Sequence, residues 1–181
     1  MKISVIGCGR WGSFLAWYLN RCGHEVLLYG RAGSANMARL RETRQNDLLS
    51  LDGEIGLTSD LSETVEFGEI LVISISSQSL RNLMAGLSSL GLEGKTLVLC
   101  MKGIESGTGL RLTEIVAEYA PGVKTAIWVG PGHVQDFLQG IPNCMVIDSA
   151  EQKIKEDLVQ ASSSDLIRFY YGNDLLGNEV G

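Results

Sequence analysis

The sequence predicts an α/β fold in which helices cover both faces of a mostly parallel, doubly wound sheet. Short apolar runs rich in β-branched residues alternate with longer segments whose apolar residues recur at helical spacing. Near-continuous apolar strands of this kind are typical of parallel sheets, which are buried on both faces. The alternation of the two patterns therefore favours strand and helix units wound onto one sheet.

Each predicted strand is a short apolar run that ends at turn-forming residues. The strands are expected at residues 3–6, 25–29, 70–75, 96–100, 125–129, 145–147 and 167–171. The helices are expected at residues 11–21, 37–44, 78–89, 110–119 and 153–161, each with an apolar face. Residues 32–36 contain Gly and Ser and are predicted to form the most flexible turn. Asn173 is expected to cap a helix that begins at Asp174, so we expect the chain to stop inside an element of a longer protein.

Composition and charge fit a globular protein of one α/β domain, or of one domain and the start of a second. The chain has 181 residues, of which 45% are hydrophobic and 20% charged, and its net charge is −6. This acidic balance argues against a surface that binds nucleic acid, since such surfaces need clustered Lys and Arg. No apolar run is long enough to span a membrane, and Arg10 interrupts the N-terminal apolar stretch that a signal peptide would need to keep continuous.

The cysteines are scattered along the chain, at Cys8, Cys22, Cys100 and Cys144. They form no CxxC pair and have no neighbouring His at ligand spacing, so neither a zinc site nor a disulfide framework is indicated. We therefore expect no metal and a reducing, cytoplasmic location.

The strongest motif is the glycine-rich turn GCGRWG, which follows the first predicted strand and opens an amphipathic helix. Gly7 permits the tight turn, Gly9 lets the backbone approach a pyrophosphate, and Gly12 allows the helix to pack closely on the strand. The helix N-terminus adds free N–H groups and the positive end of a dipole. A GxGxxG pattern alone is weak evidence and can be only a flexible turn. Here the strand before it, the helix after it and the second strand together predict a Rossmann-type dinucleotide-binding domain.

The end of the second predicted strand bears on the choice between NAD and NADP. Rossmann sites that require NAD usually place Asp or Glu there, whose carboxylate binds the ribose diol. This chain has Tyr29, Gly30 and Arg31 instead. The Arg31 guanidinium can pair with a 2′-phosphate or stack on adenine, so we expect NADP to be accepted at least as well as NAD. The alternative is an exposed loop arginine that meets no ligand.

Three other sequence features are weaker candidates for a functional site. The triplet GKT at 94–96 resembles the end of a P-loop, but Ser89 stands where the first glycine is needed, and the triplet precedes a strand. A nucleotide triphosphatase is therefore not predicted. His24 is interpreted as a surface turn residue. His133 follows an apolar strand at its carboxyl end, and it either faces a substrate or opens the next helix.

Lys102 is the strongest single candidate outside the glycine turn. It follows the strand predicted at 96–100, where an ammonium would meet a phosphate or carbonyl oxygen of a ligand. Its position between an apolar run and Gly103 favours ligand binding over a solvated turn lysine.

Five segments carry a family resemblance, in the order GCGRWGSFLA, ISISSQSLRNLM, CMKGIESGTGLRLTEI, VGPGHVQDFLQGIPNCMVI and GNDLLGNEVG. Each is modest alone, but together they resemble the N-terminal domain of bacterial NAD(P)-dependent glycerol-3-phosphate dehydrogenase along essentially the whole chain. The resemblance implies cofactor contacts at Arg10, Trp11, Arg31 and Val134. It implies substrate-site positions at Gly130 and Gly132, to which we add the neighbouring His133 as a candidate. Lys102 resembles the lysine that the family uses near both cofactor and substrate.

The chain departs from the family pattern at two of these positions. The family often has Ser or Thr where Gly132 stands, so the role of the missing hydroxyl would fall to the backbone. The family usually has Ser where Arg10 stands, and this guanidinium would either strengthen pyrophosphate binding or be incidental.

The resemblance also implies a division of the chain. Residues 1–172 would form the NAD(P)-binding domain, and residues 173–181 would begin a helical second domain that is otherwise absent from this chain. The family's catalytic lysine would lie a few residues beyond Gly181, so we expect no catalytic residue here and almost no activity from this chain alone.

For the intact protein the resemblance implies an oxidoreductase, expected to be a homodimer. It would reversibly reduce dihydroxyacetone phosphate to sn-glycerol 3-phosphate with NAD(P)H, for glycerophospholipid synthesis. Two alternatives stay open. One is another two-domain Rossmann dehydrogenase, of the ketopantoate or hydroxyacid reductase type, and the other is a stand-alone dinucleotide-binding module that performs no chemistry.

Overall fold

The computed structural model describes residues 1–181 and contains one eight-stranded sheet with the order β3-β2-β1-β4-β5-β6-β7-β8. The strands are β1 (Lys2–Ile6), β2 (Glu25–Tyr29), β3 (Gly56–Thr58), β4 (Ile70–Ile73), β5 (Thr96–Leu99), β6 (Lys124–Val129), β7 (Asn143–Ser149) and β8 (Ile167–Tyr171). Every neighbouring pair is parallel except β6 and β7. The mostly parallel sheet predicted from the sequence is therefore confirmed.

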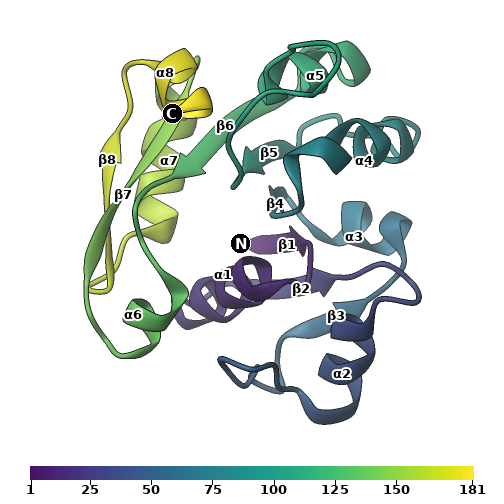
Figure 1. Cartoon of the computed structure of the whole chain (residues 1–181), viewed down its shortest axis with the longest axis vertical. Coiled ribbons are helices and arrows are strands. Elements are labelled where there is room, and N and C mark those ends of the chain that lie inside the picture. The colour runs from purple at the N-terminus through teal and green to yellow at the C-terminus, as the bar shows by residue number, and fades with distance from the viewer.

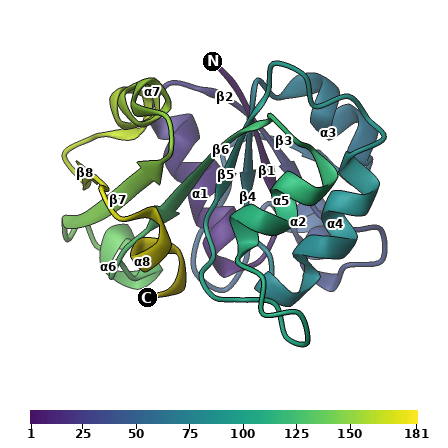
Figure 2. The same cartoon turned by 90° about the horizontal axis from the view of Figure 1, so that it is seen from above.

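Helices lie on both sides of this sheet (Figure 1). They are α1 (Arg10–Arg21), α2 (Ala35–Thr43), α3 (Leu61–Phe67), α4 (Leu80–Leu87), α5 (Leu112–Tyr119), α6 (Val134–Leu138), α7 (Gln152–Ser162) and α8 (Leu175–Val180), and the 3₁₀ turn η1 (Ser77–Ser79) precedes α4. Figure 2 shows α3, α4 and α5 on one side of the sheet and α1, α6 and α7 on the other. The doubly wound arrangement is thus confirmed as well.

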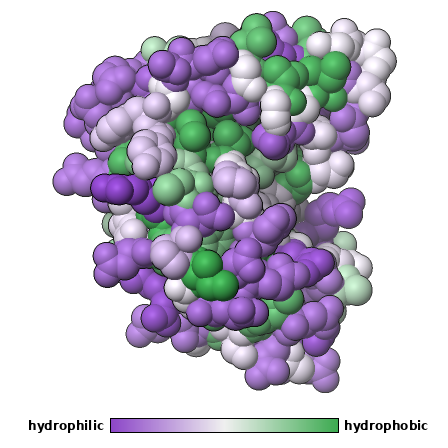
Figure 3. Space-filling view, turned by 60° about the vertical axis from the view of Figure 1, so that its left-hand side comes forward, coloured by the Kyte–Doolittle hydropathy of each residue, from purple (hydrophilic) through white to green (hydrophobic).

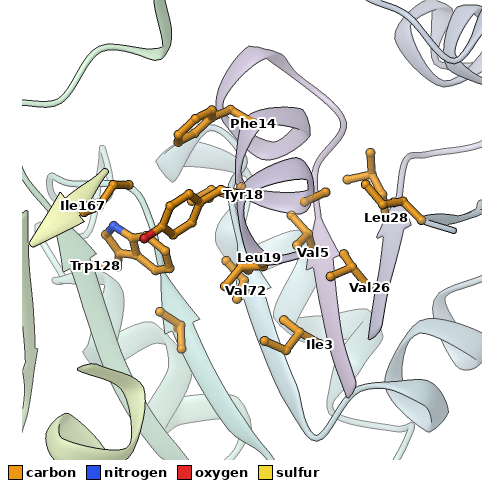
Figure 4. Packing of buried hydrophobic residues seen from close by; sticks show 14 of the residues in the cluster. Ile3, Val5, Phe14, Tyr18, Leu19, Val26, Leu28, Val72, Trp128 and Ile167 are labelled. Atoms are coloured by element: carbon orange, nitrogen blue, oxygen red, sulfur yellow. The ribbon is translucent and has the colours of Figure 1, made fainter. Parts of the chain in front are cut away.

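The hydrophobic core on the α1 side fixes this helix against the central strands. Phe14 and Tyr18 of α1 are buried in one cluster with Val5 of β1 and Val72 of β4. Tyr18 lies beside Trp128 of β6, with the two ring centroids 6.2 Å apart in an edge-to-face arrangement (Figure 4). The start of α1 is consequently held close to the end of β1, where the glycine turn lies.

The opposite face of the sheet packs against α3, α4 and α5. Successive residues of β4 point to opposite faces, so Val72 belongs to the α1 side while Leu71 and Ile73 belong to the second core. Both faces are therefore buried, which explains why the strands read as continuous apolar runs.

Three short elements were not predicted. β3 has three residues, and α3 has seven, of which only Thr64 and Val65 are buried, so neither shows a clear period. The cap of α3 is the signal that remained, because the Asp60 side chain accepts hydrogen bonds from N–H groups of the first turn. The five-residue α6 begins directly after His133, so this histidine does open a helix.

Several predicted boundaries were wrong. The helix expected at 78–89 is divided into η1 and α4. Asn173 does not cap the last helix; Asp174 does, and its side chain accepts a hydrogen bond from the Gly177 N–H at 3.0 Å. Ser34, inside the turn predicted to be flexible, caps α2 by accepting a hydrogen bond from the Met37 N–H at 3.4 Å.

The surface is mainly hydrophilic, with some apolar side chains left uncovered. Figure 3 views the side of the molecule that carries β7 and β8, where hydrophobic residues gather in the upper and middle parts. Leu176 and Val180 of α8 are 58% and 41% exposed. No helix combines the length and the apolar composition needed to cross a membrane.

Candidate functional site

A cleft of about 790 Å³ opens where β1, β2 and β4 end. The glycine turn, residues 29–31 after β2 and residues 74–76 after β4 all line it. β1 pairs with β2 on one side and with β4 on the other, so the order of the strands reverses at β1. Ligands of open α/β sheets bind at the carboxyl ends of the strands at such a reversal. The cleft therefore lies where this fold places its ligand.

Two glycines of the turn are required by the fold itself. Gly7 has a φ of +118°, and a Cβ added to it would lie 2.1 Å from the carbonyl oxygen of Ser74. A Cβ on Gly12 would lie 1.8 Å from the carbonyl oxygen of Gly7. Both positions keep β1, its turn and α1 in close contact, so a side chain at either would force the backbone apart.

Gly9 has no such requirement. Its φ of −75° and ψ of −172° suit any residue, and a Cβ built on it would meet nothing within 4 Å. Gly9 lines the cleft, so the missing side chain leaves space on the cleft side. Neither the backbone conformation nor packing within the protein requires glycine at position 9. The absence of a side chain here instead allows a ligand to approach the backbone closely.

The first turn of α1 offers hydrogen-bond donors to the same space. The first helical bond runs from the Ser13 N–H to the Gly9 carbonyl, at 2.9 Å. The N–H groups of Arg10, Trp11 and Gly12 have no partner in the protein, and Gly9 has no side chain with which to cap them. Free N–H groups at the positive end of a helix dipole are suited to a phosphate.

Two arginines add positive charge at the cleft. Arg10 and Arg31 are exposed and line it, and neither takes part in any of the ion pairs of the structure. In a chain of net charge −6, two uncompensated guanidinium groups at one cleft favour an anionic ligand.

The wall of the cleft formed after β4 was missed. The predicted strand extended to residue 75, but β4 ends at Ile73, and Ser74 and Ser76 turn into the cleft. The serine-rich segment at the carboxyl end of a buried strand is the signal that would have found them. The lining residues that sequence reasoning did not single out as site residues are Ile6, Cys8, Tyr29, Gly30, Ser34, Asn36, Leu61, Ser74, Ile75, Ser76, Ser79, Asn82, Leu83 and Cys100.

A second, smaller cavity of about 240 Å³ adjoins the cleft. It shares Trp11 and Cys100 with the cleft. Its other lining residues are Met101, Lys102, Trp128, Val129, Gly130, Gly132 and Met145. The structure therefore brings Lys102, Gly130 and Gly132 together beside the glycine turn, as a shared substrate region would require, while their individual roles stay predictions.

Cys100 lies at the junction of the two cavities. Burial raises its pKa well above the usual range of a thiol, because the thiolate would lose its hydration. The neutral thiol leaves Lys102 as the charged group among the lining residues of the smaller cavity.

The departure from the family pattern at Gly132 has a packing reason. A Cβ on Gly132 would lie 2.3 Å from the ring of Phe137. This ring stacks on Phe14 with a centroid distance of 5.2 Å and is tilted against Trp11 at 6.4 Å. Phe137 fills the space that a Ser or Thr side chain would need, so only the backbone of residue 132 can face the cavity.

Two predicted contacts lie outside both cavities. Val134 is 7% exposed and packs in the core of the α1 side. His133 is exposed at the N-cap position of α6. Neither side chain lines the cleft or the smaller cavity, so contacts by these residues stay predictions without geometric support.

The two remaining motifs have structural positions. His24 lies in the turn before β2, as predicted, but it is half-buried, and its Nε2 lies 2.7 Å from the carbonyl oxygen of Ala161 at the end of α7. His24 is therefore a turn residue that remains partly exposed, and its ring also links this turn to the end of α7. The GKT triplet ends at Thr96, the first residue of β5, so it precedes a strand as expected.

Free N–H groups at a helix start, an open space above Gly9 and unpaired arginines at a strand reversal define this chain as a Rossmann dinucleotide-binding domain. The residues fit a pyrophosphate, which needs close backbone approach and donors rather than a metal cluster. No three His, Cys, Asp or Glu side chains are grouped closely enough to hold a metal ion.

Comparison with known proteins identifies the family. The model of the family described as NAD-dependent glycerol-3-phosphate dehydrogenase N-terminus matches residues 2–155, and the chain belongs to this family. It is 33% identical over 184 residues to a glycerol-3-phosphate dehydrogenase [NAD(P)+] of Parvibaculum lavamentivorans, and 36% identical over 181 residues to that of Afipia carboxidovorans. Each alignment covers 99% of this chain and 55% of the relative. The chain thus spans about half the length of these relatives.

Solved structures show the same fold. The glycerol-3-phosphate dehydrogenase of Coxiella burnetii superposes with a TM-score of 0.90 at 22% identity, covering 98% of this chain and 55% of that one. A pyrroline-5-carboxylate reductase, also from Coxiella burnetii, superposes over 95% of this chain and 58% of its own, with a TM-score of 0.70 at 9% identity. The fold is therefore shared with a reductase that acts on another substrate. The match to a sequence family, not the fold, distinguishes this chain from such reductases.

Proposed function

We propose that this chain binds NAD(P)H in the cleft at the glycine turn and forms the cofactor half of a glycerol-3-phosphate dehydrogenase. In the whole protein the reaction would interconvert dihydroxyacetone phosphate and sn-glycerol 3-phosphate. The names of the relatives support this substrate and cofactor, and family membership favours it over ketopantoate or hydroxyacid reduction.

The observation that carries the proposal is the conformation of Gly9. Neither backbone geometry nor packing requires a glycine at this position. Gly9 directly precedes the three unpaired N–H groups in the first turn of α1. A diphosphate in this space would accept hydrogen bonds from those N–H groups, and a side chain would exclude it.

The chain's own residues would divide the work as follows. Arg10 and the start of α1 hold the diphosphate, and Arg31 holds the adenosine end, where it can pair with a 2′-phosphate. Lys102 presents its ammonium to the phosphorylated substrate from the smaller cavity, where the backbone of Gly130 and Gly132 also lies. Bound NAD(P)H supplies the hydride.

We also propose a cellular location and an oligomeric state for the whole protein. All the cysteines are free thiols, which suits the reducing cytoplasm. We propose a homodimer for the whole protein, in which the division at residue 172 separates the cofactor domain from a helical domain that carries the proton donor.

The substitution Gly9→Ser tests the proposal. Serine suits the conformation and is a favoured N-cap, so its hydroxyl would take up N–H groups of α1 while its Cβ fills the space above the turn. We expect thermal stability to be unchanged or raised, and the Kd of NADPH to rise about a hundredfold, through the loss of charged hydrogen bonds. Calorimetric titration of NADPH and NADH measures the affinity, and the change in tryptophan fluorescence, to which Trp11 in the cleft contributes, checks it.

Gly53→Ser is the matched control. Gly53 also has open space around its Cβ position and lies outside the cleft, so the same substitution there should leave NADPH affinity unchanged. Unaltered affinity in Gly9→Ser would place the nucleotide elsewhere and reject the proposed site.

A further inference from the structure

The loop between β5 and α5, residues 100–111, carries Lys102 and is held by other elements. From η1, the Gln78 amide donates a hydrogen bond to the Ile104 carbonyl at 2.9 Å and accepts one from the Ser106 N–H at 2.8 Å. These bonds fix the middle of the loop. Its two ends are both tied to one residue of α8.

That residue is Glu179, whose side chain is fully buried. Its carboxylate accepts hydrogen bonds from the Thr113 N–H at 2.5 Å and the Thr113 hydroxyl at 2.9 Å. It also lies 3.2 Å from a guanidinium nitrogen of Arg111. The carboxylate thus satisfies an N–H group in the first turn of α5 from 66 residues away along the chain.

The backbone of Glu179 holds the other end of the loop. Its carbonyl oxygen accepts a hydrogen bond from the Gly103 N–H at 3.0 Å, and Gly103 directly follows Lys102. The side chain and the carbonyl of one residue therefore hold the loop at Gly103 and at Arg111, on either side of the segment that follows Lys102, and Lys102 itself lines the smaller cavity.

This arrangement does more than attach α8 to the body of the molecule. Leu175 packs against the core, and Asn178 donates a hydrogen bond to the buried Asp148 at 2.9 Å, so α8 has other anchors. A buried carboxylate must be fully hydrogen-bonded, and its bonds are directional. Glu179 consequently fixes where the loop lies relative to α8, which an apolar residue at 179 could not do.

We propose that Glu179 is a positioning residue for Lys102, and that it couples the position of α8 to the ammonium in the ligand cavity. The proposal rests on the proposed function, in which Lys102 faces the cofactor and the phosphorylated substrate. Its consequence is that a displacement of α8 moves Lys102, so ligand binding at Lys102 and the placement of the last helix influence each other.

The test uses the chain with its lysines labelled by ¹³C reductive methylation, which preserves their charge. The chain has six lysines, and the Lys102 signal is assigned by its loss in Lys102→Arg. In the unaltered chain we expect a broad Lys102 signal that shifts when NADPH is added. In Glu179→Gln we expect this signal to narrow at temperatures well below unfolding, its NADPH-induced shift to fall by at least half, and the Kd of NADPH to rise several-fold.

Glu114→Gln is the matched control. Glu114 pairs with the same Arg111, at 3.0 Å, and accepts a hydrogen bond from the Arg111 N–H, but it makes no hydrogen bond or ion pair with α8. It should weaken the start of α5 without changing the Lys102 signal. A purely structural role of Glu179 would lower the thermal stability of Glu179→Gln and leave the Lys102 linewidth unchanged, which would overturn the proposal.

A milder variant keeps the test decisive where Glu179→Gln does not fold. Thr113→Val removes one of the bonds of the carboxylate and should narrow the Lys102 signal to a smaller extent. An unchanged signal in that variant contradicts the proposal. If the proposed function were wrong, NADPH would not bind the unaltered chain. The linewidth of the Lys102 signal would still show whether Glu179 positions Lys102.

Discussion

Arg31 is the side chain on which the choice between NADP and NAD is expected to depend. It is exposed at the end of β2, lines the cleft and has no carboxylate partner, so its charge is available to a 2′-phosphate. We predict that Arg31→Asp raises the Kd of NADPH roughly tenfold to a hundredfold, since a hydrogen bond to a charged group contributes ~1.5–3 kcal/mol. The Kd of NADH should change much less, and parallel calorimetric titrations measure both.

Arg168→Asp makes the same change of charge away from the cleft. Arg168 is exposed on β8 and lies outside the cleft and every ion pair of the structure. Both variants change the net charge by the same amount, so a long-range effect of net charge should alter the Kd of NADPH equally in both. The difference between the two Kd values then reports the local effect at Arg31. Equal changes of affinity for NADPH and NADH in Arg31→Asp would remove Arg31 from the 2′-phosphate site.

At the scale of elements, an ion pair joins α4 to the loop that carries Lys102. Arg81 binds the Glu105 carboxylate through two nitrogens, at 2.8 and 2.9 Å, and the Thr108 hydroxyl donates to the same carboxylate at 2.6 Å. The guanidinium and then the hydroxyl lower the pKa of Glu105 from 4.5 to about 2. The carboxylate is thus favoured in the folded state over the unfolded state.

This lowered pKa predicts a pH dependence of stability. Above pH 4.5 Glu105 is ionised in both states and its contribution is complete, whereas below pH 4.5 the unfolded state takes up the proton first. The contribution is then lost as the pH falls toward about 2. Glu105→Gln should lower the free energy of unfolding at neutral pH and flatten its fall across this interval, as measured by urea unfolding at a series of pH values.

Glu118→Gln is the control for this prediction. Glu118 pairs with the same Arg81 at 2.7 Å, but its side chain is 48% exposed, so solvent screens the pair. Its removal should change stability little at any pH. A similar loss in both variants would mean that the charge of Arg81, rather than its geometry with Glu105, stabilises the loop.

The elements that sequence patterns predicted are those with a buried face several residues long. α1 and the central strands have continuous apolar or helical periods because they pack on two cores. β3, α3 and α6 are too short to show a period, and their presence depends on caps and on neighbouring strands. The extent of each element follows from tertiary contacts that a local pattern does not contain.

The candidate site was predictable where one segment forms it and was missed where several do. The glycine turn combines its conformation, donors and helix in six consecutive residues, from Gly7 to Gly12. Ser74 and Asn82 become lining residues only because β4 lies beside β1 in the sheet. From the sequence, Gly132 is interpreted as the loss of a hydroxyl that the family often has at this position. In the structure, the absence of a side chain at Gly132 leaves space for the ring of Phe137.

For the molecule as a whole, the two adjoining cavities contain groups suited to ligand binding. Free N–H groups and two arginines line the cleft, and Lys102 is the one charged residue that lines the smaller cavity. Reduction of a ketone also needs a donor that stabilises and protonates the developing alkoxide, and such a group contributes roughly a hundredfold or more to the rate. The family resemblance of the sequence implies a lysine beyond Gly181 for this role, and the chain spans 55% of the length of its relative.

We therefore predict that residues 1–181 bind NADPH and are stabilised by it without reducing dihydroxyacetone phosphate. At a free NADPH concentration of about one hundred times Kd, binding adds ~2.7 kcal/mol to the free energy of unfolding, which raises Tm by roughly 5–10 °C. NADPH oxidation in the presence of dihydroxyacetone phosphate should stay at background for this chain and appear in a protein extended to the full length of the relatives. Robust turnover by residues 1–181 would mean that Lys102 alone supplies the proton, and an extended protein that binds NADPH without turnover would favour a binding module over an enzyme.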